Sequence, residues 1–432
     1  MASVFFSIRS KGLSKYLKRG RAIVSNYGLT PSKMTRALDQ FAHVLQDFGC
    51  GATFPITAIA VKRNAKSIEK YVAQGIEFAV HGYRHIDHSQ LTLQEQISQL
   101  HQAQDVFKAA GIPVTGFRSP YLRFNNHLRK AASEIGLAYV SNQPVLWDVL
   151  DIETFSPAAQ AAYQRAIKLY SPWLADRQPA LPILYDQLVE IPVSLPDDEI
   201  LLDRLESNGA NLVETAWSRI LDETYRRQEL FTVQLHPERT SRCAAALAGL
   251  LARARSLDPP VWVARLEEIA GWWRARSQAA VTVTNVGNGD LHLSLEGPEG
   301  IHLLVRNVEV DGPTREWIDG YQCCEVPTVL LKTGIRPFIG VPVGTSQEVI
   351  DYLRQQDYIV ETSRDPVNHS IYLDEPDDIL EDKRALLDRI ETSGQPLVKL
   401  GRWPNQARSA LSITGDVDAL TIWDYGLRFV GY

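Results

Sequence analysis

The chain has 432 residues, which is too long for one typical domain and predicts two. Hydrophobic residues make up 45% and charged residues 22%, proportions that are ordinary for a soluble globular protein with a large core. The formal net charge of −6 gives no support for a nucleic-acid partner, and no apolar run approaches the length of a membrane span.

The cysteines and the N-terminus predict a cytoplasmic protein. The four cysteines lack metal-binding spacing, so reduced thiols are the simpler interpretation. The apolar residues 4–6 are too few for a signal-peptide core. The basic residues at positions 9–21 are a solvated arm in the simpler interpretation. The alternative is peripheral contact with an anionic membrane surface or a lipid-linked phosphate.

Strands are predicted to alternate with helices over the first 280 residues. This order favours a parallel sheet built from right-handed crossover units. The expected strands are residues 51–59, 76–80, 114–117, 137–140, 188–193 and 230–235, and the expected helices are residues 31–47, 66–73, 92–110, 126–135, 198–226, 241–256 and 265–276.

Polar residues directly follow three of these strands. His81 follows the second strand, Arg118 the third and His236 the last. In a barrel of parallel strands the active site forms at this end. We therefore expect the three side chains to lie together. The simpler alternatives are a structural ion-pair partner for Arg118 and a capped strand end for His236.

The pair His81 and His85 is a candidate metal-binding motif. Imidazoles four residues apart converge on one ion if the chain turns helically after the strand. A catalytic zinc site takes three protein ligands and keeps one position open, and two histidines with one carboxylate are a common set. The motif therefore requires an Asp or Glu from elsewhere. An ordinary hydrogen-bonded histidine pair is the alternative.

The pattern changes near residue 280. Residues 281–284, 291–295 and 301–305 alternate with a period of two between turn sequences, which predicts antiparallel strands. Helices are expected at residues 346–356 and 378–392. We predict a β-rich second domain at residues 280–401, inserted into a barrel made of residues 1–279 and 402–432.

A last apolar strand, residues 410–414, ends in Asp416 and Asp418. Two carboxylates that straddle one residue can divide the work, because one can bind a metal while the other handles a proton. This pair supplies the carboxylate that the histidines require. The alternative is a pair of loop aspartates that cap a turn.

Four motifs, Thr414-Gly-Asp416-Val-Asp418, His81-Gly-Tyr-Arg-His85, Arg118-Ser-Pro-Tyr121 and Leu235-His236, form a specific combination. It resembles that of the polysaccharide deacetylase family, the NodB-homology domain of carbohydrate esterase family four. The resemblance covers roughly residues 30–278 and 402–432. It implies an α/β fold, a distorted (β/α)7 barrel.

The paired aspartates close this chain, whereas in the family they open the domain. We therefore expect a circularly permuted barrel. Its seven strands are the six above and residues 410–414, which we expect beside the strand that holds His81. The family's fourth motif, an Asp with a Trp, matches poorly. Trp147-Asp148 is the nearest candidate, and Asp151 follows it closely. The sequence therefore does not identify the partner of His236.

The resemblance implies that Asp418, His81 and His85 hold one divalent metal ion, expected to be zinc. Such an ion lowers the pKa of bound water to roughly 7 and polarises a carbonyl. His88 lies outside the family pattern and is expected in a supporting or surface position.

The resemblance also implies the proton-transfer roles. Asp416 would be the general base, held by Arg118, and the backbone N–H of Tyr121 would bind the oxyanion. Tyr121 packed beside Pro120 is the simpler alternative. His236 would be the general acid for the leaving amine.

Three further residues are candidates for the substrate cleft. Trp147 is either a sugar platform or a core residue, and Asp148 follows it. The loop with Asp197 and Asp198 either lines the cleft or supports His236, and a helix cap is an equally good interpretation of Asp198.

The predicted function is removal of an N-acetyl group from an amino sugar in a glycan or a sugar-carrier precursor, with release of acetate. The alternatives are hydrolysis of another C–N bond, such as that of a cyclic ureide or imide, and a non-catalytic carbohydrate-binding protein. The sequence does not define the sugar, the carrier, the oligomeric state or the role of residues 280–401.

Overall fold

The computed structural model describes residues 27–205, 210–374 and 382–429. The basic N-terminal segment lies outside these residues. Within them, none of the helices has the length and apolar character needed to cross a membrane.

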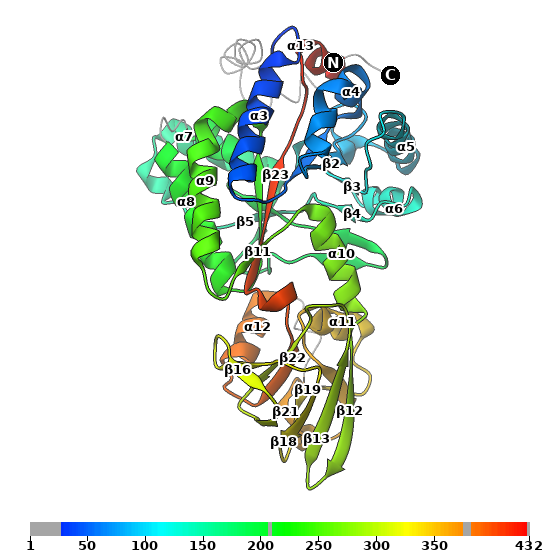
Figure 1. The fold of residues 1–432 in the computed structure, drawn as a ribbon, viewed down its shortest axis with the longest axis vertical. Coiled ribbons are helices and arrows are strands. Elements are labelled where there is room, and N and C mark those ends of the chain that lie inside the picture. The colour runs from blue at the N-terminus through cyan, green and yellow to red at the C-terminus, as the bar shows by residue number, and fades with distance from the viewer. Residues whose placement is uncertain (1–26, 206–209, 375–381, 430–432) are drawn as a thin grey trace.

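A nine-stranded sheet is the centre of the larger part of the chain (Figure 1). All seven predicted strands belong to it, in the order β10, β23, β1, β2, β3, β4, β8, and each pairing along this path is parallel. Their bounds are β1 (Thr53–Ile56), β2 (Glu77–Val80), β3 (Gly116–Phe117), β4 (Tyr139–Val140), β8 (Leu188–Glu190), β10 (Leu230–Leu235) and β23 (Ser409–Gly415). Strand β7 (Ile183–Tyr185) pairs antiparallel with β8, and β11 (Val261–Val263) pairs with β23.

Amphipathic helices pack around this sheet (Figure 1). In α3 the buried residues Met34, Leu38, Phe41 and Leu45 follow the three-and-four spacing of a single helical face. The helices are α3 (Ser32–Asp47), α4 (Ala58–Val72), α5 (Leu93–Ala109), α6 (His127–Glu134), α7 (Pro157–Tyr170), α8 (Ala210–Arg226), α9 (Thr240–Ser256) and α10 (Leu266–Ser277). The predicted α/β barrel is confirmed, as a curled half-barrel whose hydrogen-bond path stays open between β7 and β10.

Two predicted strands are shorter than expected. β1 ends at Ile56, and the apolar residues after it form the first buried turn of α4. The run at residues 188–193 divides around Pro192, which has no N–H to give to a sheet. β9 (Val193–Leu195) therefore leaves the large sheet and joins β5 (Pro144–Leu146) and β6 (Trp173–Leu174) in a small one.

The last strand of the chain is an interior strand of the sheet. β23 pairs with β10 from Leu230↔Ala410 to Leu235↔Gly415, and with β1 at Thr53↔Thr414. The prediction that β23 lies beside the strand holding His81 is wrong, because β1 lies between β23 and β2. Gly415 fits this crowded position, since a Cβ there would lie within 2.9 Å of the rings of Phe41 and Phe54.

Residues 280–400 form three further sheets, and no described strand among them pairs with the large sheet. Two of the sheets are antiparallel, as expected, but the third, β20-β19-β21, is parallel. The domain limits drawn from the sequence stay a prediction. The elements are β12 (Ala280–Gly287), β13 (Asp290–Glu296), β14 (Leu303–Arg306), β15 (Glu309–Asp311), β16 (Thr314–Glu316), β17 (Tyr321–Cys324), β18 (Thr328–Lys332), β19 (Arg336–Pro342), α11 (Gln347–Gln355), β20 (Val360–Ser363), β21 (His369–Tyr372), α12 (Lys383–Thr392) and β22 (Leu397–Leu400).

A buried ionic cluster joins the two parts. Asp357, after α11, pairs with Arg276 of α10 and accepts from Nε of Arg402 at 2.5 Å. All three residues are at least nine-tenths buried. Removing one member of such a cluster leaves uncompensated buried charge, which costs more than the intact cluster contributes.

We expect Asp357→Asn to lower the free energy of unfolding by about 3–5 kcal/mol, because it leaves two buried arginines without a carboxylate. Asn retains the shape and tolerates the positive φ of 78° at this position. Urea denaturation of the full chain measures the change. The exposed pair Arg253–Asp222 is the matched control, and Asp222→Asn should cost at most about 1 kcal/mol. Equal losses in the two variants would contradict the prediction.

Candidate active site

The candidate active site lies at the carboxyl ends of four parallel strands. Residues that follow such ends gather at one edge of a sheet, because parallel strands point the same way. They are His81 after β2, Arg118 after β3, His236 after β10 and Asp416 after β23. The structure therefore brings together the strand-end residues that the sequence singled out.

Three side chains converge as a candidate metal-binding group. Oδ1 of Asp418 lies 3.0 Å from Nε2 of His85 and 3.5 Å from Nε2 of His81. Nδ1 of His81 lies 2.8 Å from the carbonyl oxygen of Arg118, which leaves Nε2 available as a ligand atom. Two imidazoles and a carboxylate are a known donor set for zinc with one open position, so the residues present fit one divalent ion.

The histidines converge through an irregular bend, and the helical turn expected between them is absent from this described segment. The bend begins at Gly82, which has a φ of 81°. A Cβ at this position would lie 2.7 Å from the carbonyl oxygen of Arg84, so glycine is required for both conformation and space.

Burial sets the charge of the metal-binding group. It lowers the pKa of His85 to about 4, although the neighbouring Asp418 acts in the opposite direction. For Asp418 burial acts upward, but the histidines and Arg428 hold its pKa well below the usual range. A neutral imidazole and an ionised carboxylate are the protonation states that bind a metal ion.

Asp416 is held by an enclosed ion pair. Its Oδ1 accepts from Nη1 of Arg118 at 2.9 Å, and its Oδ2 accepts from Nε2 of Gln234 at 2.8 Å. Arg118 is 0% exposed and also donates to Oγ1 of Thr414 at 2.6 Å and to Ser141. These contacts fix the Asp416 carboxyl group in one orientation.

Sequence reasoning missed Gln234. It lies two residues before His236 in an extended segment, so both side chains point to the same side of the sheet. That spacing is the signal that could have identified it.

His236 has Asp198 as its partner. Nδ1 of His236 lies 2.7 Å from Oδ1 of Asp198, and the backbone N–H of His236 donates to Oδ2 at 2.8 Å. Burial by itself lowers the pKa of His236, but the charge and hydrogen bond of Asp198 outweigh it and hold this pKa well above the usual range. Asp198 therefore favours the charged form of His236.

The nearest sequence candidates for the partner of His236, Asp148 and Asp151, were wrong, because Asp198 occupies this position. Asp148 is exposed, and Asp151 precedes a short 3-10 turn. The expectation that the loop of Asp197 and Asp198 supports His236 is confirmed by these contacts. The capping role falls to Asp197, whose Oδ1 accepts from the N–H of Ile200 at 2.8 Å. Asp197 is buried, and burial together with the charge of Asp198 raises its pKa to about 7.

Trp147 occupies the hydrophobic core, with an exposed fraction of 2%. The guanidinium of Arg227 lies 5.4 Å from the centre of its ring. This environment corresponds to the core alternative. A role for Trp147, Asp148 or Asp197 in substrate binding stays a prediction.

Three further residues surround the metal-binding group. The ring of Tyr121 packs edge-on against His85, with centroids 4.4 Å apart, and its φ of 62° turns the backbone sharply at this point. His88 is 0% exposed, so a surface position is wrong, and it packs against Phe117. Arg428 was not predicted, and its Nη2 lies 3.5 Å from Oδ2 of Asp418. No motif marks it, because it lies in a short 3-10 turn outside the predicted strands and helices.

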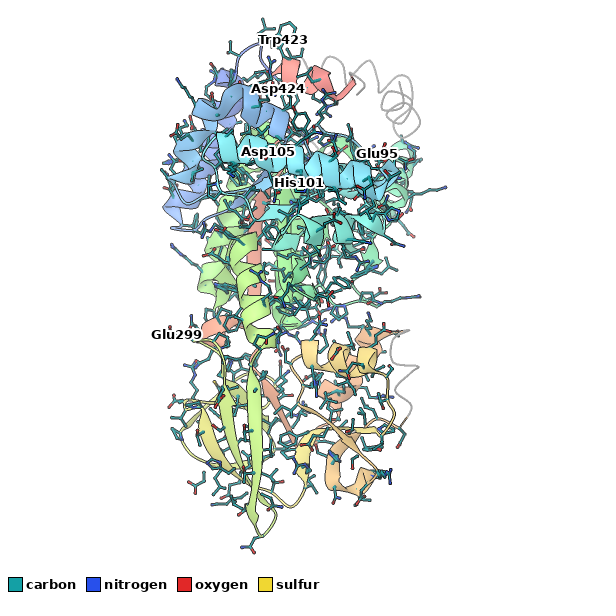
Figure 2. All side chains as sticks on the ribbon, turned by 90° about the vertical axis from the view of Figure 1, so that its right-hand side faces the viewer. Glu95, His101, Asp105, Glu299, Trp423 and Asp424 are labelled. Carbon is teal, nitrogen blue, oxygen red and sulfur yellow. The ribbon has the colours of Figure 1, made fainter. Side chains whose placement is uncertain are left out.

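We expect about one divalent ion per chain in the wild type and its loss in Asp418→Ala, because two histidines alone leave the ligand set incomplete. Elemental analysis of the purified proteins measures this. A chain that ends before Arg402 lacks β23 and should lose the ion as well. His101→Ala is the control, since His101 is exposed on α5 (Figure 2). An ion retained by Asp418→Ala would contradict the ligand assignment.

The chain is similar to several proteins of known structure. Solved structures similar to it include proteins named as polysaccharide deacetylases from Mycobacterium smegmatis (22% identity, TM-score 0.42, covering 58% of this chain and 81% of that one) and Pseudomonas aeruginosa PAO1 (20%, 0.43, 55% and 73%). Another is the allantoinase Puue (18%, 0.43, 55% and 72%). Residues 21–140 match the family model described as polysaccharide deacetylase. This segment, rather than the whole chain, is therefore similar to the polysaccharide deacetylase family.

Proposed function

We propose that this protein is a metal-dependent hydrolase that removes the N-acetyl group from an amino sugar and releases acetate. The observation that carries the proposal is that the two aspartates after β23 have different partners. Asp418 contacts two histidines, whereas Asp416, two residues earlier, forms an ion pair with a buried arginine. The family match supports a deacetylase reaction, and the donor set supports a divalent ion, which we propose to be zinc.

In this mechanism His81, His85 and Asp418 hold the metal, which when bound supplies a Lewis acid and an acidified water. Asp416 takes the proton of the attacking water, and Arg118 keeps that carboxylate ionised and aimed. As negative charge develops on the acetyl oxygen, this oxygen accepts a hydrogen bond from the backbone N–H of Tyr121.

His236 completes the reaction as the general acid. It donates its Nε2 proton to the amine nitrogen as the C–N bond breaks, since Nδ1 is committed to Asp198. The products are acetate and a free amino sugar. Asp416 and His236 thus perform opposite proton transfers from the ends of two paired strands.

We also propose that the barrel is circularly permuted, with residues 280–401 inserted before its displaced strand. The position of β23 between β10 and β1 supports this, because it places the paired aspartates at the same edge of the sheet as the histidines. The N-acetylated glycan or sugar carrier is the proposed substrate. The cytoplasmic location stays a prediction.

Asp416→Asn tests the proposed base. We expect acetate release from N-acetylglucosamine oligomers to fall by about 10²- to 10⁴-fold while metal content is unchanged, because Asn retains the shape but cannot accept the proton. Unchanged release would contradict the role of Asp416. Parallel assays on a cyclic ureide test the alternative C–N hydrolysis, and turnover of the ureide without acetate release would replace the proposed reaction.

Asp198→Asn tests the acid. Because Asp198 raises the pKa of His236, its neutralisation should lower that pKa, and the acid form is then lost at lower pH. We expect the alkaline limb of the kcat/KM profile to move down by roughly 1–3 pH units. A limb that stays in place, in a folded variant, would show that His236 does not control it.

A further inference from the structure

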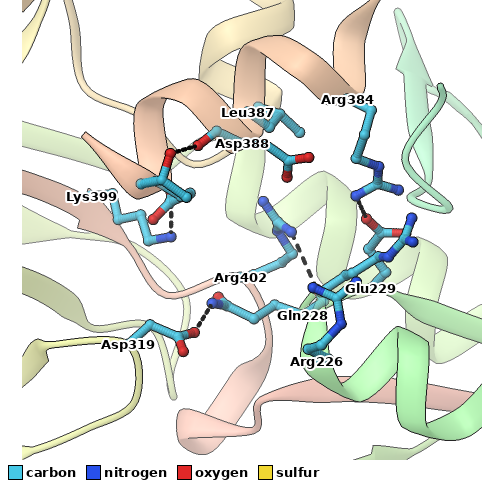
Figure 3. Close-up of a pocket in the computed structure, with 12 residues that line it drawn as sticks. Arg226, Gln228, Glu229, Asp319, Arg384, Leu387, Asp388, Lys399 and Arg402 are labelled. Carbon is cyan, nitrogen blue, oxygen red and sulfur yellow. Dashed lines mark hydrogen bonds and ion pairs between the residues drawn. The ribbon is translucent and has the colours of Figure 1, made fainter. Parts of the chain in front are cut away.

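A cavity of about 280 Å³ lies where the inserted segment meets the half-barrel (Figure 3). Residues 226–229, helix α12 and the chain around β22 line it. One water molecule occupies roughly 30 Å³ in the liquid, so the cavity has room for a polyatomic ion.

The lining is rich in cations: Arg226, Arg227, Arg384, Lys399 and Arg402. Three of them are buried, with exposed fractions of 2% for Lys399, 7% for Arg384 and 9% for Arg402. Charges removed from water in this way require compensating partners.

The surrounding carboxylates are shared. Each of three carboxylates serves two cations, so positive charge remains at each set. The sets are Asp357 with Arg276 and Arg402, Glu223 with Arg226 and Arg227, and Glu391 with Arg306 and Lys399.

The remaining lining carboxylates offset this excess only in part. Glu229 pairs with Arg384, and Asp319 lies 3.6 Å from Arg408. Asp388 of α12 is the one lining carboxylate without an ion-pair partner among the described residues. The single negative charge of Asp388 does not balance the excess positive charge of the three sets.

Lys399 and Arg402 also retain donor capacity. Lys399 donates to Oε1 of Glu391 at 2.9 Å, and its Nζ also lies 4.7 Å from the centre of the Tyr321 ring, so these two contacts do not occupy all three of its N–H groups. Arg402 donates through Nε to Asp357 and through Nη1 to the carbonyl of Gln228, and none of the described residues accepts from its Nη2. Burial lowers the pKa of Lys399, and the nearby charge of Arg402 acts in the same direction.

We infer that this cavity binds a phosphate group, either as inorganic phosphate or on a small phosphorylated metabolite. A tetrahedral dianion offers several acceptor oxygens and balances more than one cation, whereas a single carboxylate balances one. Lys399 and Arg402 are the inner donors, and Arg226, whose side chain is 62% exposed, is the outer one.

This phosphate site is separate from the candidate active site. Glu229 directly precedes β10 and Arg402 precedes β23, whereas His236 and Asp416 follow the same two strands. The cavity and the proposed metal site therefore lie at opposite ends of one strand pair.

Isothermal titration calorimetry of the metal-loaded full chain with inorganic phosphate tests the inference. We expect one saturable site, weakened about tenfold or more in Lys399→Met, since a charged donor is lost. Arg226→Gln should weaken binding several-fold. Its exposed side chain makes a folding defect improbable, so it tests the site even if Lys399→Met fails to fold. Glucose 6-phosphate is titrated in parallel, and tighter binding than inorganic phosphate would identify a metabolite as the ligand.

Two controls separate this site from other cationic positions. Arg253→Gln removes an exposed arginine outside the cavity and should leave phosphate binding unchanged. Asp418→Ala should also retain it, because the proposed metal group is remote. Absence of saturable binding, equal affinity in Arg226→Gln and wild type, or loss of binding in Asp418→Ala alone would overturn the inference.

Discussion

The pairing of β23 with β10 and β1 is the interaction on which the rest of the structure depends. It inserts the end of the chain between strands that lie some hundreds of residues earlier, and every residue of β23 is buried there. The cost of closing so long a loop grows only slowly with its length, so burial of a complete interior strand can offset it. Asp416 and Asp418 both follow this strand, and neither is in place until it has docked.

Environment gives the polar groups at this edge opposite protonation states. Asp416 accepts hydrogen bonds from a buried arginine and from an amide donor, which hold its carboxyl group in one orientation. His236 has a buried carboxylate on Nδ1, which favours the charged imidazolium. His85 is buried, which lowers its pKa and favours the neutral imidazole. The base, the acid and the metal ligand of the proposed mechanism would thus be ordinary side chains whose properties are set by burial and neighbouring charge.

Charge is arranged differently at the other end of the same strands. There residues 280–400 meet the half-barrel through buried arginines and a lysine that share too few carboxylates. Burial and the charge of Arg402 lower the pKa of Arg276 to about 9, which shows how costly this concentration of charge is. The junction therefore holds the two parts together while retaining attraction for an anion.

The sequence by itself determined the seven strands, the change of pattern near residue 280 and the residues at the strand ends, because hydrophobic periodicity and local spacing are short-range properties. It also indicated that the chain end supplies the missing carboxylate. Only the tertiary structure decided that Asp198 partners His236, that Gln234 and Arg428 contact the aspartates, and that β1 separates β23 from β2. Each of these contacts joins residues from separate elements of the fold. The order of the strands and the geometry of the loops fix such contacts, and neither leaves a periodic pattern in the sequence.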